Sequence, residues 1–87
     1  MIDRNLLRAV DANGGDRVFQ RATITPDAEV DAFDTLATRL LEHVSSGYLD
    51  LVSVPLLDYT RADMHYTAIH VQLTTEGRRI AREESTM

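Results

Sequence analysis

The sequence predicts one small α+β domain over residues 1–87, with its elements in the order helix, strand, long helix, β-hairpin and short helix. Three observations lead to this prediction. A chain of 87 residues is long enough for one domain only. Its middle carries a long apolar stripe at helical spacing. Near the C-terminus, residues 66–73 alternate between apolar and polar in the way a half-buried strand does.

The first helix is predicted to follow Asp3, whose side chain suits a helix N-cap. Glycines 14 and 15 come after Asn13 and predict the end of this helix, because these residues tolerate the left-handed backbone conformation. The apolar residues at near-helical spacing are Ile2, Leu6, Leu7 and Val10.

Residues 17–24 favour a short strand because they are rich in β-forming residues. One parity of this segment holds Val18, Gln20, Ala22 and Ile24. Phe19 breaks the strict alternation, so a helical turn is the alternative.

The long helix is predicted over residues 25–47. Thr25 is a suitable N-cap, Pro26 suits the first helical position, and the acids that follow complement the helix dipole. Gly47 predicts the end of the helix, and Tyr48 is placed to fold back onto its last turn. The apolar stripe comprises Val30, Phe33, Leu36, Ala37, Leu40, Leu41 and Val44.

Two β-like runs, residues 49–57 and 66–73, predict the hairpin, and the polar residues 58–65 between them predict a loop. Pro55 cannot donate to a strand ladder, so we expect it at an edge or a strand end. Thr74 or Thr75 is expected to cap a last helix over residues 76–83.

Composition and charge restrict the function. The chain has no cysteine, no apolar run of the roughly 20 residues that span a membrane, and no apolar leader segment, which predicts a cytoplasmic protein without membrane contact. The formal net charge is −5, and all nine basic residues are arginine. Residues 25–50 hold six acids against Arg39 alone, so the centre of the chain is its most acidic part.

Two passages resemble the winged-helix superfamily. Residues 35–49, TLATRLLEHVSSGYL, resemble a recognition helix that runs through a glycine into the wing. Residues 71–79, VQLTTEGRR, resemble the end of the wing and the start of the helix after it. The resemblance implies a small DNA-binding transcriptional regulator, in the form of a homodimer. Winged helices place two helices before the wing, whereas here either a short helix over residues 26–33 precedes Asp34 or the two helices are fused.

On this resemblance, the residues that would contact double-stranded DNA lie on the long helix and on the wing. Arg39 would fork to a guanine, and Thr38 would touch a phosphate or a thymine methyl. The complete predicted nucleic-acid-binding set is Thr35, Thr38, Arg39 and His43, with Arg61 on the wing.

The alternative is a protein-interaction or dimerisation module that does not bind DNA. Its acidic helix face would meet a basic protein, or the apolar residues 52–57 would meet a second copy of the chain. No enzyme motif and no cofactor motif is present, so we expect a non-enzymatic protein. His65 and His70 are five residues apart and therefore on opposite faces of a strand, and His43 has no second ligand at i+4, so we expect no metal site.

Overall fold

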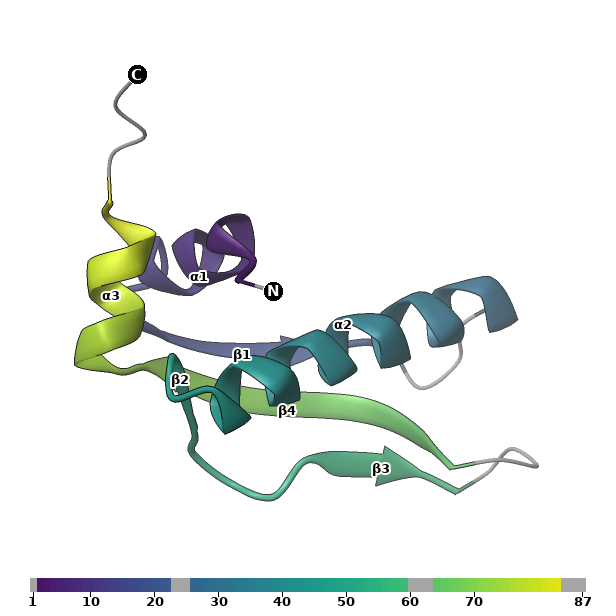
Figure 1. Ribbon diagram of the computed structural model, residues 1–87. Helices are drawn as coiled ribbons and strands as arrows, with labels where there is room; N and C mark the ends of the chain where they lie inside the picture. The colour runs from purple at the N-terminus through teal and green to yellow at the C-terminus, as the bar shows by residue number, and fades with distance from the viewer. Residues whose placement is uncertain (1, 23–25, 60–63, 84–87) are drawn as a thin grey trace.

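The computed structural model describes residues 2–22, 26–59 and 64–83, and within them it has the predicted order of elements (Figure 1). The first helix, strand and long helix are α1 (Arg4–Asp11), β1 (Asp16–Gln20) and α2 (Asp27–Ser45). The hairpin and last helix are β2 (Leu49–Leu51), β3 (Leu56–Asp58), β4 (His65–Leu73) and α3 (Thr75–Ala81). The α+β class and the element order are confirmed.

The sheet is antiparallel, and β4 is its central strand. It pairs with β1 along one side, while β2 and β3 share its other side. The first strand of the predicted hairpin is thus two short strands, with Pro55 immediately before β3. This confirms the prediction that Pro55 lies at a strand end on an edge of the sheet.

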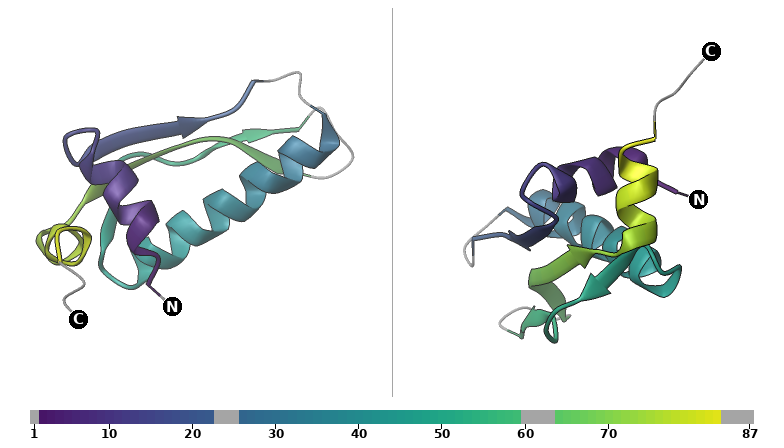
Figure 2. Two further views of the ribbon diagram at one scale, coloured as in Figure 1. Left: turned by 90° about the horizontal axis from the view of Figure 1, so that it is seen from above. Right: turned by 90° about the vertical axis from the view of Figure 1, so that its left-hand side faces the viewer.

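The helices lie against one face of the sheet and leave the other face uncovered (Figure 2). The alternation in β4 follows this division. Ile69, Val71 and Leu73 are buried beneath the helices, and Ala68, His70 and Gln72 have the opposite parity. The core that the helices and the sheet enclose includes Leu6, Leu7, Val10, Phe33, Leu40, Leu49 and Ile80.

Strand β1 corrects the predicted division of its side chains. The segment is a strand, but Phe19 is the residue that is buried, whereas Val18 is 48% exposed on the uncovered face. Phe19 pairs with Ile69 of β4, which also faces the helices. The cross-strand partner therefore decided which parity of β1 enters the core. Residues 23–25, which include part of the predicted strand, lie outside the described residues.

The sequence left open whether a separate short helix over residues 26–33 precedes Asp34 or one fused helix covers the segment. Helix α2 is one continuous helix, so the fused alternative holds. It begins at Asp27, with Pro26 at the cap position, and Thr25 lies outside the described residues. Asp34 is in the interior of α2 and does not cap a second helix. The segment contains no glycine or proline that would break the helix, and Val30, Ala37 and Leu40 remain buried along one stripe.

The ends of the other helices follow the sequence closely. Gly47 adopts a positive φ of 87°, and the Tyr48 amide donates to the carbonyl oxygen of His43, so the chain folds back as predicted. Of the two threonines considered as the cap of α3, Thr74 is the one whose hydroxyl accepts from the Gly77 amide. None of the helices in the described ranges has both the length and the apolar content that crossing a membrane requires.

Candidate functional site

The predicted DNA-contacting residues of α2 do not all lie on its outer face. Thr35, Thr38 and Arg39 are exposed there. The Thr35 hydroxyl donates to the carbonyl oxygen of Asp31 at 3.0 Å, and the Thr38 hydroxyl donates to that of Asp34 at 2.9 Å. Both threonines therefore bond back to their own helix, as threonines within helices often do.

His43 was expected on the exposed face, and this expectation is wrong. The residue is 3% exposed, and both of its ring nitrogens have partners. Nε2 accepts from the Asp3 amide at 2.9 Å, so Nδ1 carries the proton that is donated to the Arg39 carbonyl oxygen at 2.7 Å. His43 ties the start of α1 to the end of α2. Residue 43 is three positions after the buried Leu40, so helical spacing places it next to the buried stripe.

Arg39 is 60% exposed at its side chain and forms a long ion pair of 3.5 Å with Asp3. Both residues line an open hollow of about 560 Å³ between the start of α1 and the end of α2, together with Arg4, Glu42 and His43. The hollow presents both charges rather than a basic surface. Arg61, the predicted wing contact, lies outside the described residues.

Arg79 of α3 and Arg82, which follows it, are also paired within the protein. Arg79 bonds to Glu76 and lies 3.6 Å from Glu83, and Arg82 forms an ion pair with Asp11 of α1 at 3.1 Å. The hydrogen bond between Arg82 and Asp11 is the largest influence on both groups, and it lowers the pKa of Asp11 and raises that of Arg82. Arg79 therefore stabilises α3 itself, and Arg82 stabilises the contact between α1 and α3.

The outer face of α2 is acidic. Five carboxylates lie along the helix against the single guanidinium of Arg39, and all of them are exposed except the half-buried Asp34. The five are Asp27, Glu29, Asp31, Asp34 and Glu42. A face of this kind repels phosphates and attracts cations.

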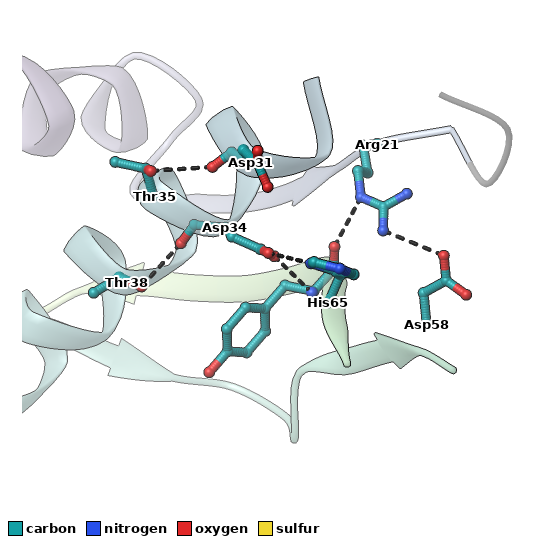
Figure 3. A network of polar contacts seen from close by, with 8 residues as sticks. Arg21, Asp31, Asp34, Thr35, Thr38, Asp58 and His65 are labelled. Carbon is teal, nitrogen blue, oxygen red and sulfur yellow. Dashed lines mark hydrogen bonds and ion pairs between the residues drawn. The ribbon is translucent and has the colours of Figure 1, made fainter. Parts of the chain in front are cut away.

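A polar cluster joins α2 to the start of β4 (Figure 3). His65 Nδ1 lies 2.5 Å from Asp34 Oδ2, and the Tyr66 amide donates to Asp34 Oδ1 at 2.9 Å. Asp31 is one helical turn before Asp34 and has its carboxylate near the same point. One ligand atom from each of Asp31, Asp34 and His65 lies within 4.8 Å of the others.

Asp34 is held in its ionised form. Partial burial alone would raise its pKa, but hydrogen bonds from His65 and the Tyr66 amide, with the charges of His65 and Arg21, outweigh burial and lower the pKa below the ordinary value of 3.8. Asp34 is therefore an anion at neutral pH and attracts cations.

A buried ion pair lies beside this cluster. Arg21 and Asp58 are 6% and 3% exposed at their side chains, with Nη2 and Oδ2 3.4 Å apart. Arg21 Nε also donates to the Tyr66 carbonyl oxygen at 2.9 Å. The guanidinium thus connects the end of β1 to β3 and β4. Asp58 was expected in the loop between the two β-like runs, and the structure corrects this, because Asp58 ends β3 and is buried.

The uncovered face of the sheet has an apolar patch at its centre. The strand register places Leu56 beside Ala68 and Val18 beside His70, and the Val52 amide donates to the His70 carbonyl oxygen from the other side. We call Val18, Val52, Leu56 and Ala68 the open-face patch. Leu56 is 64% exposed and Val52 44%, so the apolar segment 52–57 does not supply core residues at these positions.

Comparisons with protein-family models, curated proteins and solved structures give no match. The side chains of the chain itself are therefore the guide to its chemistry. They offer three features: an acidic helix face, a carboxylate–imidazole cluster and an apolar patch on an open sheet.

Proposed function

We propose that this chain is a non-enzymatic, cytoplasmic, winged-helix-like interaction module that forms a homodimer through the open-face patch. The observation that carries the proposal is the exposure of Val18, Val52 and Leu56 on the uncovered face of the sheet. The cytoplasmic location is proposed because the sequence holds no cysteine.

An antiparallel sheet with one solvated face normally has polar side chains on that face. Here Asp16 pairs with Gln72 on the open face, His70 lies beside Val18, and Gln20 lies beside Ala68. Large apolar side chains are nevertheless exposed among them, since Leu56 is 64% and Val18 48% exposed. Covering an exposed leucine or valine side chain completely is worth about 1.5–3 kcal/mol. In a twofold-symmetric dimer each such contact is made twice.

The DNA-binding regulator implied by the winged-helix resemblance has less support from α2. Non-specific DNA affinity comes from neutralising phosphates, and the outer face of α2 has five carboxylates and one arginine. That arginine is paired with Asp3, and His43 is buried. The acidic face fits a basic protein segment better than it fits DNA.

Analytical ultracentrifugation over a concentration series tests the dimer directly. We expect the wild-type chain to sediment as a dimer at micromolar concentration. Leu56→Glu places a charge in the patch and is expected to give a folded monomer, because Leu56 is too exposed to support the core. Ile2→Glu is the matched control, since Ile2 is an exposed apolar residue that precedes α1, away from the sheet face.

A wild-type chain that sediments as a monomer at all concentrations would contradict the dimer proposal. DNA binding is measured in parallel, with random genomic fragments over a salt series. Binding that weakens steeply with salt and is lost in Arg39→Ala would favour the regulator instead. The interaction module is expected to show no such binding.

A further inference from the structure

The polar cluster brings His65 to two aspartates of α2, and each of the three side chains offers an atom that can bind a metal ion. Asp31 and Asp34 lie one turn apart on α2, and His65 begins β4. Their ligand atoms lie within 4.8 Å of one another. The carboxylate of Asp31 makes no hydrogen bond or ion pair with the residues that the structure describes, so it is free to turn towards the other two.

The ligand set selects a class of ion. Imidazole nitrogen favours zinc, cobalt and nickel over magnesium and calcium, which prefer oxygen alone. Zinc binds imidazole nitrogen and carboxylate oxygen at distances of about 2.0–2.2 Å. Two ligand atoms on a tetrahedral zinc ion are therefore about 3.3 Å apart. The Nδ1 of His65 and Oδ2 of Asp34 are 2.5 Å apart, so the two atoms have to move only slightly further apart to bind the same ion.

Asp34 is oriented as metal ligands usually are. Its Oδ1 accepts from the backbone amide of Tyr66 at 2.9 Å, which leaves Oδ2 directed at His65. Hydrogen bonds of this type fix the direction of a ligating carboxylate and are a regular part of metal sites. The side chains of Asp34 and His65 are 28% and 18% exposed, so water reaches the point between them.

The charges around the cluster favour a cation. Arg21 is the basic side chain that acts on Asp34, and it is paired with the buried Asp58. Asp27 and Glu29 add negative charge within the first turn of α2, just before Asp31. Two anionic ligands and this surrounding charge outweigh a guanidinium that is already paired.

A second histidine–aspartate pair on the same strand provides the contrast. His70 Nε2 bonds to Asp16, and Gln72 donates to the other oxygen of that carboxylate at 2.8 Å. No second carboxylate from the described residues joins this pair to form a group of three metal-ligating residues. The two pairs thus share the histidine–aspartate contact and differ in the third ligand.

We propose that Asp31, Asp34 and His65 bind one divalent ion of the zinc, cobalt and nickel class, with water completing its coordination. The ion replaces the contact between Asp34 and His65 and fastens the first half of α2 to the start of β4. The proposal does not depend on the homodimer. The spacing of the histidines had predicted no metal site, whereas the ligands that join His65 are two acids of the long helix.

Isothermal titration of the tag-free chain with zinc chloride at pH 7.5 tests the site, together with thermal unfolding in the presence and absence of zinc. We expect one ion per chain and a higher Tm with zinc. Titration with cobalt chloride should give the visible absorption bands of a cobalt ion bound to nitrogen and oxygen.

Asp31→Asn is the decisive variant, because Asp31 is exposed and its side chain does not support the fold. We expect it to lower zinc affinity by more than about tenfold, the loss that even outer-shell partners of metal ligands can cause. Glu29→Gln is the matched control, with the same loss of charge on the same helix. His65→Gln and His70→Gln form a second matched pair, in which only the first should abolish binding.

Three results would overturn the proposal. The first is the absence of stoichiometric zinc binding to the wild-type chain. The second is equal affinity in Asp31→Asn and Glu29→Gln, which would indicate a general attraction of cations to the acidic face. The third is loss of binding in His70→Gln with binding retained in His65→Gln.

Discussion

The two ends of the sheet are held together in different ways. At one end α1 and α3 meet over the end of β4, and Leu7, Val10 and Ile80 are buried between them. At the other end the first half of α2 lies over the start of β4 without a second helix beside it (Figures 1 and 2). There, polar contacts between Asp34 and His65 and between Arg21 and Asp58 add to the packing of the buried Val30 and Phe33.

This difference predicts which end of the domain is sensitive to pH and to ions. Apolar packing responds little to pH or ions, whereas carboxylate and imidazole groups respond to both. We therefore call the two regions the packed end and the polar end, and expect substitutions to reveal two separate kinds of sensitivity.

The largest effect is expected at the polar end, for Arg21→Met. The side chains of Arg21 and Asp58 are almost fully buried, so the substitution removes a cation from beside a buried carboxylate. Breaking a buried pair in this way costs about 3–5 kcal/mol of unfolding free energy. Urea denaturation followed by circular dichroism measures the loss.

Arg39→Met is the matched control for this substitution. Arg39 and Asp3 are 3.5 Å apart, against 3.4 Å for the buried pair, but the Arg39 side chain is 60% exposed. An exposed pair contributes at most about 1 kcal/mol. Equal losses in the two variants would show that burial is not what distinguishes the pairs.

A somewhat smaller effect is expected at the packed end, for Leu7→Ala. Leu7 is fully buried in the core, and removing its side chain costs the transfer free energy together with a cavity, about 3 kcal/mol. Leu56→Ala, on the open sheet face, should cost less than about 0.5 kcal/mol in the monomer. Thermal and urea unfolding of both variants make the comparison, and a large loss in Leu56→Ala would mean that the patch is already covered.

The smallest effect is a dependence on pH that arises at the polar end. The folded-state pKa of Asp34 lies below its ordinary value of 3.8, so its contacts contribute stability that is complete well above pH 3.8. This contribution is lost as the pH falls through the lowered pKa. Asp34→Asn should therefore reduce stability at neutral pH and flatten its fall in acid, as measured by urea unfolding at a series of pH values.

Thr35→Ala is the neutral comparison for Asp34→Asn, because Thr35 is exposed on the same helix and does not titrate. Its stability should follow the wild-type chain across the whole pH series. An acid profile of Asp34→Asn that runs parallel to the wild type would show that Asp34 does not supply the pH dependence.

Much of the fold was predictable because its signals are local. Asp3 and Thr74 cap their helices, and Gly47 ends α2, as the properties of these residue types suggest. The alternation of β4 follows from its own sequence, which has apolar residues on one parity and Ala68, His70 and Gln72 on the other. These features need no knowledge of the partner elements.

The site was less predictable because its signals are not local. The exposed positions of α2 were predicted correctly for Thr35, Thr38 and Arg39, but His43 is buried because the start of α1 covers it and donates to its ring. The meeting of Asp34 and His65 joins residues 31 positions apart. The DNA-contacting role of the α2 residues remains a prediction.

The local order of residues specifies the elements of this protein, which are an amphipathic helix, capped helix ends and a strand with one apolar face, because each depends on neighbouring residues. Which polar groups meet depends instead on how these elements pack. Asp31, Asp34 and His65 come together because α2 crosses the start of β4, and Arg21, which follows β1, meets Asp58 of β3 across the intervening strand β4. Contacts of this kind depend on packing across elements, and a linear pattern of residues does not record them.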